Sequence, residues 1–234
     1  MAGVTITPVE GIGEANPGDD VATLIGDAIA ATTLLADGDV LVVTHKLISK
    51  AEGRIVELAD DGPDAHRFLI EDEAVRIIRR RGPLVIAQTR HGFICANAGV
   101  DRSNAGTARA ILLPEDPDRS ANRIRLRLQN RFGATIAVIV TDTFGRAWRR
   151  GLVDVAIGVA GMEAIDDLRG TTDTFGKVLE VSEVAIVDEI AAAADLVMGK
   201  ATGIPAAIVR GVTWRPADTG IAPLIRPASE DMFR

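Results

Sequence analysis

The stretch from Ala134 to Val140 limits the possible folds of this 234-residue chain more than any other segment. It is almost wholly apolar, and it directly follows a helical pattern over Pro117–Phe132 that Gly133 would end. A continuous apolar strand needs cover on both faces, so this one is expected in the middle of a sheet that helices flank.

Other segments alternate between the two kinds of pattern. Some expected strands follow each other directly, so we predict a mixed α/β (α+β) architecture with mixed sheets rather than a pure doubly wound sheet. No linker marks a domain boundary, and residues 1–234 are interpreted as one unit. The expected strands are Val4–Val9, Val40–Thr44, Leu84–Thr89, Gly92–Cys95 and Ala206–Val209. One helix is expected to begin after Asp19 or Asp20, and two others are expected to span Glu71–Arg81 and Val184–Met198.

Composition narrows the class of protein. A hydrophobic fraction of 47% predicts a globular chain, and a net charge of -7 argues against nucleic acid as a partner. Cys95 is the only cysteine, which fits a reducing cytoplasm. No targeting segment and no apolar run of about 20 residues is present, so we expect a cytoplasmic protein without a membrane span.

Only four of the 26 basic residues are lysines, namely Lys46, Lys50, Lys177 and Lys200. All four lie in polar segments that contain glycine. A compact ammonium suits a phosphate oxygen as a point charge, whereas chance placement is the alternative.

Asp142 is the strongest single candidate for chemistry. It follows the apolar strand, where α/β proteins place ligand groups, and Thr141 and Thr143 add hydroxyl oxygens. Such hard oxygen donors suit Mg²⁺ or Mn²⁺, and Mg²⁺ commonly bridges carboxylates to substrate phosphates. The alternative is an aspartate that only forms a turn or a helix cap.

Two further segments combine glycines with polar side chains. Residues 97–104 offer Asp101 as a metal ligand and Asn104 as a nucleotide contact, with an Asx-rich turn as the alternative. Residues 45–54 follow a strand, and their cations and hydroxyl suit phosphate. The exposed start of a helix is the alternative there.

Residues 144–151 place three arginines and a tryptophan close after Asp142. Arginine forks match carboxylates or phosphates, and a flat indole suits stacking on a ring system. We therefore predict Arg146, Trp148 and Arg149 as contacts of the amino-acid or phosphodiester substrate. A surface loop with a half-buried tryptophan is the alternative.

The pentapeptide TDTFG occurs at 141–145 and again at 172–176. Flanking residues do not repeat, so chance explains the second copy better than a repeat architecture. No strand pattern precedes Asp173, which stays a candidate substrate contact without a metal role. The chain also lacks the common phosphate-loop and dinucleotide motifs, so a nucleotide would bind outside the commonest nucleotide-binding folds.

Together, seven ordered segments resemble the coenzyme F-420-0:L-glutamate ligase (gamma-glutamyl ligase) family, from Pro8 to about Arg226. They are HKLISKAEGR, IEDEA, ANAGVDRSN, TDTFGRAWRRG, GTTDTFGKVL, DEIAAAADLVMGK and GIPAAIVRG. The resemblance implies a gamma-glutamyl-ligase-like fold of two interleaved subdomains, and a homodimer. Mycobacterial relatives carry a fused reductase-like domain, and this chain is interpreted as the stand-alone form.

The resemblance also implies GTP as co-substrate and two Mg²⁺ or Mn²⁺ ions per site, with K⁺ as a further candidate. By motif, Asp101 and Asp142 match ligands of one metal, and Thr143 matches a ligand of the second. Asp142, Asp101 and Lys50 are thus the predicted catalytic residues. Predicted nucleotide contacts are Ile12, Gly13, Glu14, Ala15, His45, Lys50, Asn104 and Gly203.

Two positions depart from the family pattern. His45 stands where relatives often have a small hydroxyl residue. Ala201-Thr202 stand where some relatives carry an acidic or amide side chain, which leaves the ligands of the second metal open beyond Thr143.

The implied reaction joins L-glutamate to the terminal carboxylate of coenzyme F-420-0 or its dehydro form. The carboxylate attacks the γ-phosphate of GTP, and the glutamate amine then displaces phosphate from the acyl phosphate. Lysine and metal charges would neutralise the phosphates. The alternatives are a ligase of the same fold with another acceptor or nucleotide, and a deazaflavin- or nucleotide-binding protein without turnover.

Overall fold

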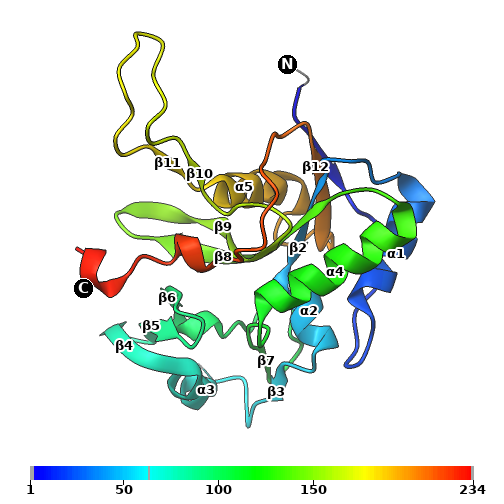
Figure 1. The fold of residues 1–234 in the computed structure, drawn as a ribbon. Coiled ribbons are helices and arrows are strands. Elements are labelled where there is room, and N and C mark those ends of the chain that lie inside the picture. Colours follow the sequence, from blue (N-terminus) through cyan, green and yellow to red (C-terminus); the bar gives the residue numbers. More distant parts are fainter. Residues whose placement is uncertain (1–2, 63, 233–234) are drawn as a thin grey trace.

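The computed structural model describes residues 3–62 and 64–232. A five-stranded sheet forms its centre, in the order β1-β12-β2-β8-β9 (Figure 1). β2 and β8 run parallel, and the other neighbours run antiparallel, so the expected mixed sheet is confirmed. The five strands are β1 (Thr5–Pro8), β2 (Val40–Thr44), β8 (Ala137–Arg146), β9 (Arg149–Ala160) and β12 (Ala206–Arg210).

Helices cover the sheet. In β8, the adjacent residues Val138 and Ile139 are both fully buried, and neighbours in a strand point to opposite faces. Both faces are therefore covered. The helices that pack around the sheet are α1 (Val21–Thr32), α2 (His45–Ala51), α4 (Pro117–Phe132) and α5 (Ile186–Met198).

The helix α4 has the start and the end that its sequence predicts. The Asp116 carboxylate accepts a hydrogen bond from the backbone N–H of Arg119, and Pro117 occupies the first turn. Gly133 ends the helix at φ +69°, a left-handed conformation that glycine adopts without steric cost. The chain then enters β8, so the sequence-predicted order of helix, glycine and buried strand is confirmed.

Residues 55–112 form a second lobe, inserted between α2 and α4, which we call the small lobe. It has its own hydrophobic cluster, which includes Leu69, Ile70 and Val85. The rest of the chain forms the main lobe, whose core surrounds the five-stranded sheet. The small lobe contains β3 (Ile55–Glu57), α3 (Arg67–Glu73), β4 (Ala74–Arg81), β5 (Leu84–Thr89), β6 (Ile94–Ala96), a short 3₁₀ turn η1 (Asn97–Gly99) and β7 (Arg109–Ile111).

The helix expected over Glu71–Arg81 is wrong. The structure has α3 up to Glu73 and then the strand β4, which pairs antiparallel with β5. The branched side chains of this segment favour a strand, and pairing lets Ile77 pack on the small-lobe cluster. By contrast, the expected pairing of residues 84–89 with residues 92–95 is confirmed by the β5–β6 ladder.

Two projecting segments complete the molecule. β8 and β9 continue past the sheet as a hairpin whose turn contains Trp148. A longer arm, residues 168–182, extends between β10 (Asp166–Asp167) and β11 (Glu183–Val184) (Figure 1). The tail contains the short turns η2 (Ala222–Leu224) and η3 (Ala228–Glu230). Within the described residues, no helix is long and apolar enough to cross a membrane.

Candidate active site

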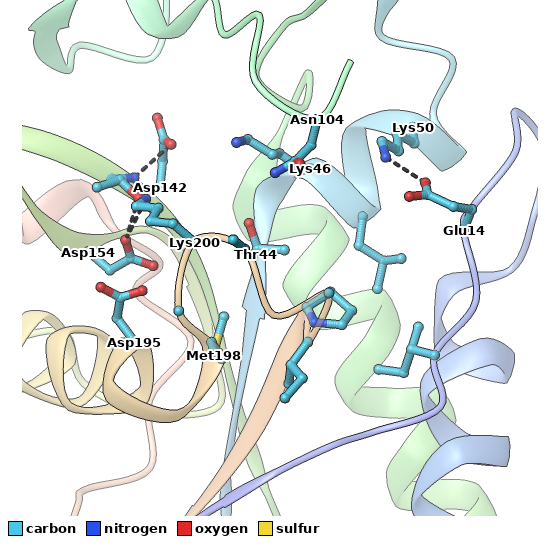
Figure 2. A pocket seen from close by; sticks show the side chains of 18 of the residues that line it. Glu14, Thr44, Lys46, Lys50, Asn104, Asp142, Asp154, Asp195, Met198 and Lys200 are labelled. Carbon is cyan, nitrogen blue, oxygen red and sulfur yellow. Dashed lines mark hydrogen bonds and ion pairs between the residues drawn. The ribbon is translucent and has the colours of Figure 1, made fainter. Parts of the chain in front are cut away.

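A pocket of about 350 Å³ opens where β2 and β8 finish their parallel pairing. The last paired residues are Thr44 and Thr141, and α2 begins directly after Thr44. Because parallel strands present their carboxyl ends at one edge, side chains that follow both strands meet there. Lining residues come from the loop before α1, from α2, β8 and β9, from the end of α5 and from the loop that follows it (Figure 2).

Ammonium groups surround this pocket. Lys46, Lys50 and Lys200 line it, whereas no arginine is among the described residues that do so. Three of the four lysines in the chain therefore converge on one cavity, which favours the functional interpretation of their placement over chance. Compact ammonium groups suit phosphate oxygens as point charges, so the pocket is chemically matched to a polyphosphate.

Two of these lysines are held by carboxylates. Lys46 Nζ lies 2.8 Å from Asp101 Oδ2 and donates to Ser103 Oγ at 2.6 Å. Lys50 Nζ lies 2.5 Å from Glu14 Oε2 (Figure 2). Burial favours the neutral acid of Asp101, but the contacts with Lys46 and Ser103 outweigh it and hold the pKa of this carboxyl below its ordinary value. Asp101 therefore carries its negative charge at neutral pH.

Asp142 lies within β8, so the expectation that it follows the end of its strand is wrong. It lies one residue beyond the last pair between β8 and β2, where β8 continues with β9 alone. Its side chain is 11% exposed and lines the pocket. Asp142 Oδ1 accepts the backbone N–H of Thr143 at 2.7 Å and lies 3.2 Å from Nε2 of His45.

His45 is fully buried and is not among the residues that line the pocket. Its Nδ1 lies 3.3 Å from Oγ of Ser49, one turn further along α2. The imidazole is thus fixed between Ser49 and Asp142, behind the cavity wall. The exposed helix start considered for residues 45–54 is wrong, because most of α2 is buried.

Two carboxylates in the pocket were not predicted from the sequence. Asp154 of β9 is paired in register with Thr143, and Asp195 comes from α5. The sequence held one signal for Asp154, because it is the only charged residue in the apolar half of its strand, residues 153–160. No comparable signal marks Asp195, which is one of three acidic residues in its helix.

The oxygen donors at this end of the pocket suit a hard divalent cation. Asp142, Thr143 and Asp154 all line the pocket, and they offer carboxylate and hydroxyl oxygens. Burial and the nearby Asp142 charge raise the pKa of Cys95 to about 12, so this thiol stays neutral. Within the described residues, however, no three His, Cys, Asp or Glu side chains form a ready cluster for a metal. Asp101, bonded to Lys46, is not among the lining residues.

The predicted nucleotide contacts are largely brought together. The pocket lining includes Ile12, Gly13, Glu14, Lys50, Asn104 and Gly203. Ala15 is buried beside this set and does not line the cavity. Asn104 belongs to the small lobe, so both lobes contribute to the cavity.

The predicted substrate contacts lie elsewhere. Arg146, Trp148 and Arg149 sit at the tip of the β8–β9 hairpin, outside the pocket lining. Residues 144–151 do form a surface hairpin tip, but Trp148 is 86% exposed, so the expected half burial of this tryptophan is wrong. Asp173 lies in the projecting arm, where its Oδ1 accepts the backbone N–H groups of Phe175 and Lys177. Asp173 therefore forms a turn there, and no strand of the sheet precedes it.

Sequence comparisons agree with this arrangement. The family model described as F420-0:Gamma-glutamyl ligase matches residues 11–211. The chain belongs to this family. It is 42% identical to the coenzyme F420:L-glutamate ligase of Methanothermobacter thermautotrophicus, over 99% of each chain. The ligases of the same name from Methanopyrus kandleri and Archaeoglobus fulgidus are 41% and 38% identical, over 98% and 99% of this chain and 97% and 96% of the relatives.

The gamma-glutamyl ligase match spans the segments that build the pocket, from the loop at Ile12 to the strand β12. The whole pocket lining falls within it. The family resemblance noted in the sequence is therefore confirmed, together with the mixed α/β fold.

Proposed function

We propose that the chain is a GTP-dependent ligase that joins L-glutamate to coenzyme F-420-0, or to its dehydro form, and releases GDP and phosphate. The observation that carries this proposal is one cavity in which Lys46 and Lys50 of α2 lie apart from the carboxylates of β8, β9 and α5, with Lys200 beside Asp154 (Figure 2). The names of the relatives support glutamate and coenzyme F420 as substrates.

Lys46 and Lys50 would hold the phosphates. Both belong to α2, and each is anchored by a carboxylate that keeps its ammonium at the cavity. The side chain of Glu14 is mostly exposed, so Lys50 exchanges it for a phosphate oxygen at low cost. The Gly13 backbone and Asn104 then offer N–H groups to the rest of the nucleotide.

The family resemblance implies two divalent cations in this pocket. Asp142 and Asp101 would hold one of them, and Thr143 would hold the other. Bound there, they would neutralise charge on the phosphates. Lys46 contacts Asp101 in this structure, so it would exchange this carboxylate for a phosphate when the nucleotide enters.

The proposed reaction has two steps. A carboxylate oxygen of the acceptor attacks the γ-phosphorus, and the bond to the β-phosphate oxygen breaks, which releases GDP. The uncharged amine of glutamate then attacks the acyl carbon, the bond from carbon to the phosphate oxygen breaks, and the amine proton passes to solvent. The lysines orient the phosphates in line with the acceptor, which is the main protein contribution to such a transfer.

We further propose that the chain forms a homodimer, as the family resemblance implies, and works in the cytoplasm, which its single cysteine fits. Arg146, Trp148 and Arg149 would contact a substrate only if it extends beyond the pocket along the β8–β9 hairpin.

A direct assay tests the ligase. The purified chain is mixed with GTP, Mn²⁺ or Mg²⁺, L-glutamate and F-420-0, and GDP and the deazaflavin product are quantified by chromatography and mass spectrometry. We expect GDP and a product that is heavier by one glutamyl unit in equal amounts. Unchanged GTP and acceptor would rule out the ligase and favour a binding protein, and faster turnover with ATP would revise the nucleotide alone.

A further inference from the structure

Asp154 has no role in the steps above, yet it is one of the few buried charged side chains in the molecule, with 6% of its surface exposed. It stands on β9 directly opposite Thr143 of β8, and both side chains line the pocket. A buried carboxylate is costly unless several donors satisfy it. The groups that donate to Asp154 are in turn oriented by it.

Two threonine hydroxyls donate to this carboxylate. Thr143 Oγ1 donates to Asp154 Oδ1 at 2.5 Å, and Thr141 Oγ1 donates to Asp154 Oδ2 at 3.2 Å. Lys200 Nζ lies 3.6 Å from Asp154 Oδ1 and supplies a partial counter-charge (Figure 2). An ionised carboxylate has only acceptor sites, so it fixes the direction of both hydroxyl protons.

A hydroxyl group has one proton and two lone pairs. While the Thr143 hydroxyl donates its hydrogen bond to Asp154, its oxygen can only accept. The Thr143 oxygen is then suited to a divalent cation, and it is unable to donate to a phosphate oxygen. Without Asp154, the same hydroxyl would rotate and donate to the nearest phosphate.

We propose that Asp154 is a positioning residue, which turns the lone pairs of the Thr143 hydroxyl toward the pocket so that this oxygen binds the divalent cation. The inference deepens the proposed function and rests on it, because it requires Thr143 to be a cation ligand through its side chain. Groups that orient a metal ligand in this way typically change metal affinity by 10- to 100-fold when they are removed.

The experiment is a double-mutant cycle on Mn²⁺ affinity, measured by the electron paramagnetic resonance signal of free Mn²⁺ with a non-hydrolysable GTP analogue present. The variants are Thr143→Val, Asp154→Asn, Asp154→Ala and the two double substitutions. Thr143→Ser keeps the hydroxyl and serves as the conservative rescue. We expect each single change except Thr143→Ser to weaken Mn²⁺ binding about 10-fold or more.

The coupling between positions 143 and 154 shows whether Asp154 acts through Thr143. If Asp154 acts through Thr143, changing Asp154 in the Thr143→Val background costs nothing further. Equal losses in both backgrounds would overturn the proposal and would make Asp154 a direct ligand or a structural residue. A wild-type chain that binds no Mn²⁺ would overturn it as well.

Asp188→Asn is the matched control. Asp188 is a largely buried carboxylate of α5 that also contacts β9, where its Oδ1 accepts the N–H of Ala156 at 2.9 Å. It does not line the pocket, so we expect its substitution to leave Mn²⁺ affinity unchanged. Product formation by the wild type separates the two proposals. Ligation without coupling between positions 143 and 154 would contradict the role of Asp154 alone, whereas absent ligation would contradict the proposed function.

Discussion

At the scale of single residues, the lysines of the chain are concentrated around the pocket. Lys46, Lys50 and Lys200 line one cavity, and Lys177 lies on the projecting arm. Asp142, Lys50 and Asn104, which the sequence offered as candidates, also line this pocket. Asp154 was not predicted because a cross-strand neighbour depends on the register of a hairpin, which local patterns do not fix.

Lys50 is expected to act on the nucleotide. Lys50→Met keeps the stem but removes the ammonium, so the Michaelis constant for GTP should rise about 10-fold or more, which corresponds to a charge-assisted contact of about 1.4 kcal/mol. Lys177→Met is the matched control, because Lys177 is exposed and remote from the pocket lining. Steady-state kinetics with varied GTP measure both, and equal behaviour of the two variants would contradict the assignment.

Asp142 is expected to be essential for turnover. Asp142→Asn keeps the volume and the acceptor for the Thr143 N–H but removes the charge that a cation needs. Turnover should fall about 100-fold or more, while the unfolding temperature stays close to that of the wild type. An active variant, or one that fails to fold, would argue instead for a structural role beside His45.

At the scale of elements, the sequence predicted the helices α1, α4 and α5, the strands β1, β2 and β12, and the first half of β8, whereas it did not predict β9. Their signals are local, since a capping residue, an apolar period and a terminal glycine lie within one segment. The helix expected over Glu71–Arg81 does not form, because pairing with β5 in the small lobe makes most of this segment the strand β4. Long-range pairing overrides a weak local preference, and arginines are compatible with both structures.

Glu73 of α3 links Arg90 of the small lobe to Arg54, which directly precedes that lobe. Its Oε1 accepts from Arg54 at 3.0 Å and from Arg90 at 2.7 Å, and its side chain is buried. Glu73→Gln leaves the Arg54 guanidinium without its charge partner, so unfolding in urea should show a loss of about 2 to 3 kcal/mol.

The control for Glu73 is Glu71→Gln on the same helix. Glu71 is half exposed, and its ion pair with Arg80 lies at the surface. Its substitution should change the free energy of unfolding by about 0.5 kcal/mol or less. Equal losses for the two variants would show that the network around Glu73 has no special role.

The docking of α4 on β9 depends on Gly158. A Cβ atom built at Gly158 would lie 2.6 Å from the backbone carbon of Pro117, at the start of α4. Gly158→Ala should therefore destabilise the chain by about 1 to 3 kcal/mol, because helix and strand must separate. Gly145→Ala meets no atom within 4 Å and is the matched control in thermal unfolding. An undiminished unfolding temperature for Gly158→Ala would contradict this tight contact.

At the scale of the whole molecule, the pocket joins two lobes with separate hydrophobic clusters. The main lobe supplies most of the lining, and the small lobe supplies Asn104. No local pattern predicts which segments of a nested chain meet, so the shared cavity was expected only through the family resemblance. Under the proposed function, a nucleotide in this pocket would contact both lobes.

Hydrogen exchange tests this contact with both lobes. GTP with Mn²⁺ should slow the exchange of backbone amides in residues 101–108 of the small lobe, as well as in the loop at Gly13, because a bound ligand stabilises the elements that it contacts. The arm at 168–182 lies outside the pocket lining and should exchange as before. Protection confined to the main lobe would contradict a nucleotide site that both lobes share.

Activation of the acceptor carboxylate as an acyl phosphate is the step that defines the proposed reaction. It is tested with F-420-0 in which both oxygens of the terminal carboxylate are ¹⁸O, together with GTP, Mn²⁺ and L-glutamate. Mass spectrometry of the released phosphate should find one ¹⁸O atom per glutamyl product, because the attacking oxygen leaves with phosphorus when the amide forms. Glutamyl product accompanied by unlabelled phosphate would contradict an acyl phosphate intermediate.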